Sequence, residues 1–187
     1  MAYALTNNEI ASTGDFEGHP TLRILELRSN KLMSLNGIKN MPSLEELYVA
    51  DNNVATIDGL EDMPSLKVLN LRKNFVENIE DEKMNELPAL EYLNLRENTM
   101  TDISSLKFLK KHKKLRNLSV KDCQIEVEEL RTEILILMPQ LDKLNKEDIG
   151  IEEREEAMNV SENRHRLAEE AKRAAEEAKE QEEDLSL

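Results

Sequence analysis

This 187-residue sequence has no tryptophan, and its three tyrosines and three phenylalanines make up only 3% of it. A core made from such a composition must be aliphatic. The single cysteine excludes a disulfide framework. No apolar run approaches the roughly 20 residues that cross a membrane as a helix, and no charged-then-apolar leader opens the chain. We therefore expect a soluble, intracellular protein that neither binds a membrane nor is secreted.

Positive charge is also scarce. The 25 Lys and Arg residues face 39 Asp and Glu residues, which leaves a formal net charge of −14. Proteins that bind nucleic acids through the phosphate backbone carry basic surfaces, so this balance argues against nucleic acid as a partner. There is no glycine-rich phosphate loop, and we expect no small-molecule substrate.

Residues that carry catalysis are few and scattered. His19, His112 and His165 fall in unrelated places, and none has a Cys or carboxylate at metal-ligand spacing. His112 lies in the basic run 110–114, for which we predict a solvated outer face. Cys123 has no base nearby in the repeat register described below, and we predict a small buried core residue there. The sequence thus predicts no catalytic residue, no metal, no cofactor and no enzymatic activity.

The sequence does contain one motif five times. The copies start at Leu22, Leu44, Leu66, Leu90 and Leu115, and successive starts are 22, 22, 24 and 25 residues apart. Each copy follows L-x-x-L-x-L-x-x-N-x-I, with other aliphatic residues replacing some leucines and Cys123 replacing the last Asn. This is the spacing of the leucine-rich repeat. It predicts an α/β solenoid with parallel strands on a concave face and short helices or turns on a convex face.

Each position of the repeat has a physical role. Leu25 and Leu27 alternate along a short strand, so both point into the core. Asn30, Asn52, Asn74 and Asn98 follow the strands, where an amide can bond backbone groups of adjacent coils that would otherwise be buried and unsatisfied. The extra residues of the two longer coils, at Glu80–Asn85 and Phe108–Lys114, are predicted on the outer side.

The two ends of the array differ. Tyr3, Leu5, Asn8 and Ile10 fit the second half of one more repeat, without a polar cap before it. We expect either that the chain begins inside a longer protein or that a partner covers this end. At the other end, apolar residues at helical spacing between Val127 and Met138, followed by 139–145, predict a cap over about 126–150. The repeat domain is therefore assigned to residues 1–150.

Residues 151–187 form a separate charged tail. Residues 152–184 contain no Gly or Pro and are rich in Glu, Ala, Lys and Arg, the strongest helix formers. Ala157, Val160, Leu167 and Ala171 lie on one helical seam, which is too poor in Leu and Ile for a stable self-paired coiled coil. We favour a long helix that lies against other proteins. A solvated single helix and a disordered tail remain as alternatives.

Alternate strand residues provide the candidate binding surface, because the concave face is the usual binding face of such arrays. The position after the third apolar residue of each copy is basic in four of five copies, and two tyrosines lie beside this row. One interpretation is a soluble filler position. The other is a groove for an acidic or helical partner segment, with Arg and Tyr as anchors. The candidate residues are Arg28, Tyr48, Asn70, Arg72, Tyr92, Asn94, Arg96, Asn117 and Lys121.

The repeats and the cap also resemble known families. The cap at 138–145 is similar to that of repeat proteins that include a protein phosphatase-1 regulator and a spliceosomal subunit. The segment Leu90–Asn98 and the passage from Leu141–Leu144 into Ile151–Ala157 resemble axonemal leucine-rich repeat proteins of the radial-spoke type. This family usually has more repeats and an acidic N-terminal extension, which are absent here.

The resemblance implies a non-catalytic structural subunit of radial spokes in motile cilia, with spoke or other axonemal proteins as partners. It implies a place in the cytoplasm and cytoskeleton, in the axoneme of a cilium or flagellum. An axonemal dynein light chain would share this fold. A phosphatase-1 regulator would carry aromatic and acidic residues along the concave strands, and a nuclear acidic repeat protein would end in nearly pure Asp and Glu.

Overall fold

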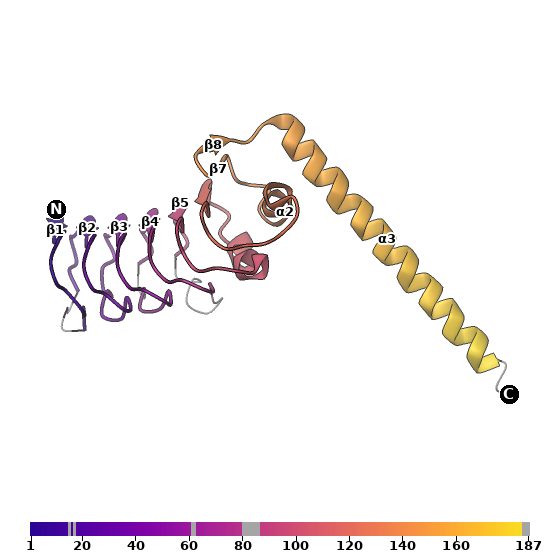
Figure 1. The fold of residues 1–187 in the computed structure, drawn as a ribbon, viewed down its shortest axis with the longest axis horizontal. Helices are drawn as coiled ribbons and strands as arrows, with labels where there is room; N and C mark the ends of the chain where they lie inside the picture. Colours follow the sequence, from indigo (N-terminus) through magenta and orange to yellow (C-terminus); the bar gives the residue numbers. More distant parts are fainter. Residues whose placement is uncertain (15, 17, 61–62, 80–86, 185–187) are drawn as a thin grey trace. The chain divides into compact units, whose positions relative to one another are not determined.

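The structure is a computed structural model, and it describes residues 1–14, 16, 18–60, 63–79 and 87–184, with side chains to residue 177. The chain divides into two compact units, Met1–Ile149 and Gly150–Leu187. Among the described residues, the first unit contains all the strands (Figure 1), and the second is one helix.

One eight-stranded sheet runs through the first unit in chain order. Neighbours from β1 to β7 pair in parallel, and β7 pairs with β8 in antiparallel fashion. Leu25, Leu47, Leu69, Leu93 and Leu118 are register partners from strand to strand, which confirms the predicted solenoid. The strands are β1 (Ala2–Ala4), β2 (Ile24–Glu26), β3 (Glu46–Tyr48), β4 (Val68–Asn70), β5 (Tyr92–Asn94), β6 (Asn117–Ser119), β7 (Lys143–Leu144) and β8 (Glu147–Asp148).

Stacked coils share one aliphatic core. The leucines at the centres of β2–β6 are at most 3% exposed. The return segments contribute their own buried residues, including Ile38, Met41, Leu60 and Met63. No coil can bury its apolar face alone, so each coil is stabilised mainly by its two neighbours.

The repeated asparagines connect the coils as the sequence predicts. Asn52 donates from Nδ2 to the carbonyl of Leu27 in the preceding coil at 2.9 Å and to that of Val49 in its own coil at 3.0 Å. Its Oδ1 accepts from the backbone N–H of Leu32 at 3.0 Å. Asn30, Asn74 and Asn98 repeat this pattern. Each side chain therefore satisfies backbone groups that the turn would leave buried without partners.

The residue just before each of these positions turns the chain. It adopts a left-handed backbone in every coil, with φ between 52° and 60°, at Ser29, Asp51, Lys73, Glu97 and Asp122. Left-handed backbone is unfavourable for residues with a Cβ, so the Asn bonds that follow help to hold it. Ser29, Asp51 and Asp122 are turn-forming residue types, whereas Lys73 and Glu97 carry no such signal in the sequence.

Cys123 and His112 both differ from the expectation of the sequence, which was a buried core residue for the first and a solvated outer face for the second. Cys123 is half-buried, and its Sγ donates to the carbonyl of Leu95 at 3.2 Å, so the thiol replaces one of the Asn bonds. Burial raises the pKa of this thiol above its ordinary value. The prediction of a solvated His112 is wrong: the side chain is buried, and its Nδ1 lies 3.3 Å from the carbonyl of Leu87. The basic residues on both sides of His112 predict an exposed segment, and the sequence does not indicate that the imidazole packs against the preceding coil.

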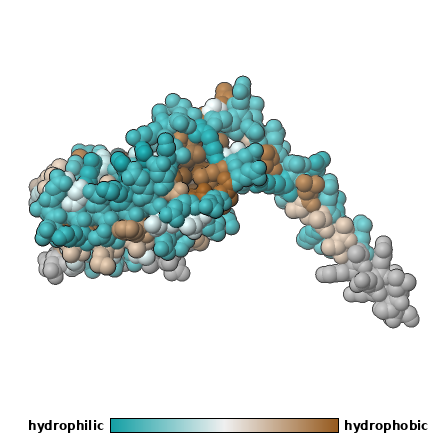
Figure 2. All heavy atoms as spheres, in the orientation of Figure 1, coloured by the Kyte–Doolittle hydropathy of each residue, from teal (hydrophilic) through white to brown (hydrophobic). Residues whose placement is uncertain are grey.

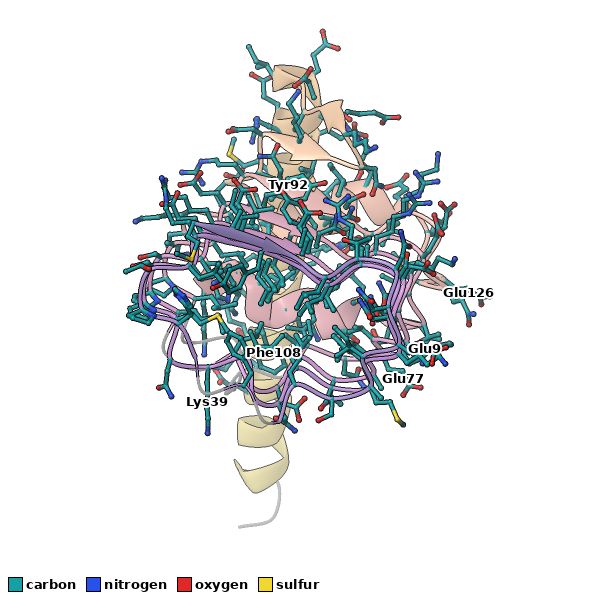
Figure 3. The ribbon with its side chains drawn as sticks, turned by 90° about the vertical axis from the view of Figure 1, so that its left-hand side faces the viewer. Glu9, Lys39, Glu77, Tyr92, Phe108 and Glu126 are labelled. Atoms are coloured by element: carbon teal, nitrogen blue, oxygen red, sulfur yellow. The ribbon has the colours of Figure 1, made fainter. Side chains whose placement is uncertain are left out.

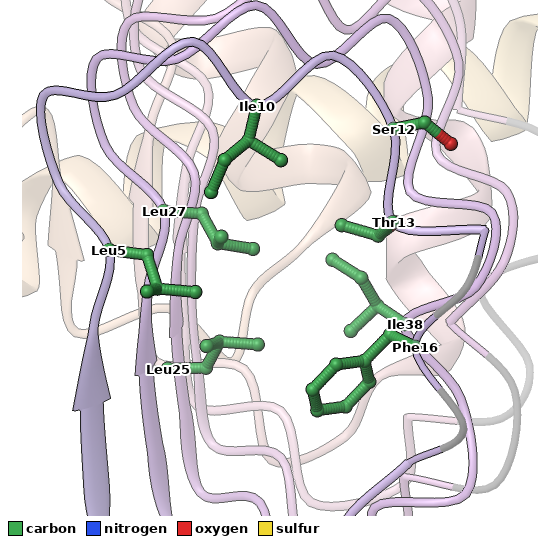
Figure 4. A pocket seen from close by; sticks show the side chains of 8 residues that line it. All are labelled: Leu5, Ile10, Ser12, Thr13, Phe16, Leu25, Leu27 and Ile38. Carbon is green, nitrogen blue, oxygen red and sulfur yellow. The ribbon is translucent and has the colours of Figure 1, made fainter.

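The first coil leaves the core open on its outer side. Tyr3 pairs in register with Leu25, but Tyr3 and Leu5 are each 41% exposed. A hollow of about 240 Å³ lies under this coil, with the Phe16 and Ile10 side chains directed toward Leu25 and Leu27 (Figure 4). The predicted half-repeat is therefore present, and its apolar side chains are only partly covered within residues 1–149.

We expect backbone amides of the isolated chain to exchange with solvent fast in β1 and slowly in β3–β5. The reason is that β1 has a neighbour on one side only and packs on a half-open core, so it opens with little loss of burial. Hydrogen exchange followed by mass spectrometry or NMR measures this difference. Equal protection in β1 and β4 would show that the first coil is as firmly packed as the middle of the array.

Helical turns and a hairpin form the far end of this unit. The 3-10 helix η1 (Ile103–Lys111) begins before the second predicted insertion, Phe108–Lys114, and overlaps it over residues 108–111, whereas the first, Glu80–Asn85, lies outside the described residues. The cap helix α2 (Leu130–Leu137) is shorter than the predicted 127–138. Asn145 and Lys146 both have positive φ and join β7 to β8, which is the backbone of a type I′ hairpin turn. The sequence reasoning missed this hairpin.

The second unit is the helix α3 (Ile151–Asp184). It starts with Glu152 and Glu153 in the first turn, where carboxylates favour the helix dipole. The carboxylate of Glu153 accepts from the Gly150 N–H at 2.8 Å, which caps the start. The tail is therefore helical rather than disordered, and its last predicted residues, 185–187, lie outside the described part.

Candidate protein-binding surface

Three columns of side chains cover the face of the sheet that points away from the core. We call this the concave face. Alternation along the strands places them there, because the intervening leucines are buried. The first column is Ile24, Glu46, Val68, Tyr92 and Asn117; the second is Glu26, Tyr48, Asn70, Asn94 and Ser119; the third is Arg28, Ala50, Arg72, Arg96 and Lys121. All nine candidate residues belong to these columns, and their binding role stays a prediction.

Arg28 and Tyr48 are in contact on this face. The guanidinium carbon of Arg28 lies 4.4 Å from the centre of the Tyr48 ring, a cation–π contact. The Tyr48 hydroxyl donates to Oε2 of Glu46 at 2.6 Å. The Tyr48 ring is thus held at its hydroxyl by Glu46, and the Arg28 guanidinium lies over its face.

The bond to Glu46, together with burial, raises the pKa of Tyr48 to about 12 from 10.0. We expect the difference in phenolate absorbance between the protein and its Tyr48→Phe variant to show a transition near pH 12. Glu46→Gln should move this transition toward pH 10, because a neutral acceptor replaces the charged carboxylate that the Tyr48 hydroxyl bonds. Between about pH 10 and 12 the Tyr48 hydroxyl is protonated in the folded protein but ionised in the unfolded chain. The contribution of Tyr48 to the free energy of unfolding is therefore full below about pH 10 and is lost as the pH rises through this window. A Tyr48 transition near pH 10 in the unaltered protein would contradict the hydrogen bond.

The other two arginines of the third column are paired within the chain. Arg72 donates from Nη2 to Oε1 of Glu97 at 2.7 Å, and the Arg96 Nε donates to Asp122 at 2.8 Å. Arg96 Nε also lies 3.3 Å from Glu97 Oε1. These carboxylates come from the left-handed turn positions, which the sequence reasoning had not connected with the basic row. Exposed pairs of this kind contribute little stability, but they partly neutralise the charge that the row offers to a partner.

The remaining candidates fall into two groups. Asn70 and Asn94 turn their side chains back on the sheet, since their Oδ1 atoms accept from the N–H of Arg72 and Arg96 at 3.1 Å. They shape the face more than they project from it, and Asn94 is buried. Tyr92 and Asn117 are half-buried in the first column, and Lys121 is exposed at the end of the third.

Six further residues of these columns are not among the candidates: Ile24, Glu26, Glu46, Ala50, Val68 and Ser119. Ile24, Val68, Glu26 and Glu46 are half-buried and alternate with the buried leucines. The signal was available, because strict alternation puts the residue before and the residue after each central leucine on one face. The sequence reasoning followed basic and aromatic residues and overlooked the acidic and aliphatic ones.

Beside the first column, a row of alternating charges joins three coils. Oε1 of Glu45 lies 2.7 Å from Nη2 of Arg23, and its Oε2 lies 3.3 Å from Nζ of Lys67. The hydrogen bond from Arg23 is the main reason that the pKa of Glu45 is below its ordinary value. In the opposite flank, Lys73 and Ser29 lower the pKa of Asp51 in the same way. These flanks therefore stay charged at neutral pH.

The described residues offer little chemistry beyond surface contacts. Among them, no group of three or more His, Cys, Asp or Glu side chains is placed to hold a metal ion. Within the same residues, no helix is both long and apolar enough to cross a membrane. Hydrophilic side chains cover most of the molecular face in Figure 2.

A leucine-rich repeat family model matches residues 5–177, which is most of the chain. The chain belongs to the leucine-rich repeat family. Proteins with this fold typically serve as interaction scaffolds for other proteins. A comparison with curated proteins finds no match.

Solved structures show the same leucine-rich repeat fold. One is the SNF/U2A′ complex of Drosophila melanogaster, with 22% sequence identity and a TM-score of 0.60, where the match covers 67% of this chain and 76% of the other. Another is an internalin (inlF) of Listeria monocytogenes, with 19% identity and a TM-score of 0.58, where it covers 79% of this chain and 48% of the other. The chain thus spans about half the length of that internalin. At these identities the likeness establishes the fold alone.

Proposed function

We propose that this leucine-rich repeat protein is a non-catalytic scaffold that binds a partner protein on its concave face. The observation that carries the proposal is the composition of that face. Its half-buried residues Ile24, Val68, Tyr48 and Tyr92 offer apolar and aromatic surface, and Arg28 is fixed on Tyr48. Tyr and Arg are the residues that most often anchor protein interfaces. A ring and a guanidinium already held in place lose little conformational freedom when a partner binds.

We further propose that the partners are axonemal and that the protein is a structural subunit of the radial spoke in motile cilia. Support comes from the resemblance of Leu90–Asn98 and of the cap-to-helix passage to axonemal proteins of the radial-spoke type, such as leucine-rich repeat-containing protein 23. The protein would then reside in the cytoplasm and cytoskeleton, at the axoneme. An axonemal dynein-associated protein of light-chain type and a phosphatase-1 regulatory protein are the alternatives.

Co-purification from a ciliated cell, followed by mass spectrometry, tests both statements. Recovery of spoke proteins supports the radial-spoke role, whereas dynein heavy chain or phosphatase-1 would favour an alternative and overturn it. Val68→Arg, in the middle of the concave face, should remove the partner. Glu77→Arg, an exposed residue of the convex side, is the matched control and should leave it bound. If the partner still bound the Val68→Arg variant and other variants of this face, the proposal that the partner binds the concave face would be wrong.

Removal of Gly150–Leu187 tests the tail separately. We expect the shortened protein to fold, because Met1–Ile149 is a compact unit that contains every strand. We also expect weaker incorporation into the native assembly, since a second contact raises the avidity of a scaffold through effective concentration. Circular dichroism would verify folding, and co-purification yield would measure incorporation. Unchanged incorporation would mean that α3 makes no contact of its own.

A further inference from the structure

The concave face carries opposite charges on its two halves. On the half over β2 and β3, the three columns contain the carboxylates of Glu26 and Glu46 and one cation, Arg28. On the half over β4, β5 and β6, they contain no carboxylate and three cations, Arg72, Arg96 and Lys121. All of these residues belong to the described part of the chain.

Ion pairs within the chain do not cancel this difference. The turn positions add Asp51 to the acidic half, and they add Lys73, Glu97 and Asp122 to the basic half. Counted together, the acidic half keeps an excess of carboxylates and the basic half an excess of cations. The backbone carbonyls of Glu26 and Lys121 accept hydrogen bonds from Leu5 and Glu97, but their side chains form no hydrogen bond or ion pair with other described residues and are available to a partner.

The two halves are far enough apart for a charged group of a partner to interact mainly with one of them. Neighbouring strands lie about 4.8 Å apart, so the centres of the two halves are separated by roughly 12 Å. The Debye length at physiological salt is about 8 Å. A charge placed over one half is therefore largely screened from the other half.

Apolar and aromatic side chains lie among these charges, on β2, β3, β4 and β5. Ile24, Val68, Tyr48 and Tyr92 are half-buried there, and Figure 3 shows Tyr92 at the sheet, away from Lys39 and Glu77. Backbone groups in the middle of a sheet are already paired, so this surface can be read only through side chains. A helix that presents one apolar face suits such a surface, whereas strand addition needs a free sheet edge.

From this arrangement we propose that the concave face binds an amphipathic helix of a partner protein in a single orientation, with the helix's basic end over β2–β3 and its acidic end over β5–β6. Five strands span about 19 Å, which corresponds to a helix of about 13 residues at 1.5 Å per residue. Apolar side chains of the helix would pack on Val68 and the two tyrosines. Charge complementarity of this kind fixes register and rejects wrong partners more than it adds affinity.

A synthetic helical peptide tests the orientation directly. The peptide has 16 residues, one apolar face, lysines at one end and glutamates at the other, with a nitroxide label at either end in two separate preparations. We expect the label at the lysine end to broaden amide NMR signals of β2 and β3. The label at the glutamate end should broaden those of β5 and β6.

Charge exchange provides the matched controls. The double variant Glu26→Lys/Lys121→Glu alters two side chains without partners in the described structure, so its fold should be kept. We expect it to weaken peptide binding by about three- to tenfold and to blur the orientation, because each rim charge changes from attraction to repulsion. Lys39→Glu/Glu77→Lys makes the same exchange at exposed positions away from the concave face and should change neither (Figure 3).

The inference rests on the proposed function, but different experimental results would contradict each of them. Equal broadening of both halves, a reversed order, or no broadening of any sheet residue at millimolar peptide would overturn the charge-ordered site. A partner that co-purifies and is lost with Val68→Arg would leave the scaffold function standing in that case. Loss of both would remove the concave face as a binding surface altogether.

Discussion

Replacement of Leu69 by Ala is expected to lower the free energy of unfolding by about 2–5 kcal/mol. Leu69 is the central residue of β4, fully buried, with Leu47 and Leu93 as its register partners. Removing most of its side chain loses apolar burial and leaves a cavity, because coils on both sides are held at fixed spacing by the strand ladder and cannot collapse into it. Thermal or denaturant melts of the purified variants measure the change.

Phe75→Ala is the control for this substitution. It deletes a larger apolar side chain close in sequence, but Phe75 is 53% exposed, so we expect a loss of less than about 1 kcal/mol. The damage from Leu69→Ala should also spread: amides of β3 and β5 should exchange faster, since each coil is stabilised by its neighbours. Equal melting of the two variants would mean that Leu69 does not carry the core.

Periodicity predicted the fold because one physical rule acts at every coil. The spacing of leucines sets which residues enter the core, and five copies in one register leave no competing arrangement. The aliphatic composition and the buried asparagines follow from the same rule. Tyr3 and Ile10 extended it correctly to the incomplete first coil, because the register continues through β1.

Features that depend on contacts between coils could not be predicted in the same way. Glu97 and Asp122 stand at turn positions, and only the stacking of coils brings them to Arg72 and Arg96. His112 is buried because its ring meets the Leu87 carbonyl of the preceding coil, which a basic run in the sequence gives no reason to expect. The left-handed turns at Lys73 and Glu97 also lack the Gly or Asn that marks such positions.

Contacts within the candidate binding surface also depend on the stacking of coils and could not be predicted from the sequence. Arg28 and Tyr48 were selected separately, as a basic and an aromatic residue, and the contact between them depends on the parallel register of β2 and β3. Glu46 was not selected, yet its carboxylate holds the Tyr48 hydroxyl. The charge difference between the two halves of the face emerges only when columns, rather than single residues, are compared.

The buried asparagines should be as sensitive to substitution as the leucines. We expect Asn74→Ala to lower the free energy of unfolding by about 3 kcal/mol or more. Asn74 donates to the carbonyls of Val49 and Leu71, each at 3.0 Å, and accepts from the Val54 N–H at 3.0 Å. A buried backbone group without a partner costs about 1–3 kcal/mol, and Ala leaves several such groups at once.

Two further variants decide whether hydrogen bonding is the cause. Asn53→Ala removes an exposed amide from the equivalent turn of the preceding coil and should change stability by less than about 0.5 kcal/mol. Asn74→Cys should fall between Asn74→Ala and the unaltered protein, because Cys123 at the equivalent place of the fifth coil keeps one bond, to the Leu95 carbonyl. A thiol donates one weak bond where the amide donates several and also accepts one. If Asn74→Cys and Asn74→Ala were equally destabilised, the Cys123 thiol would not be a substitute for the amide, and the fifth coil would depend on the cap for its stability.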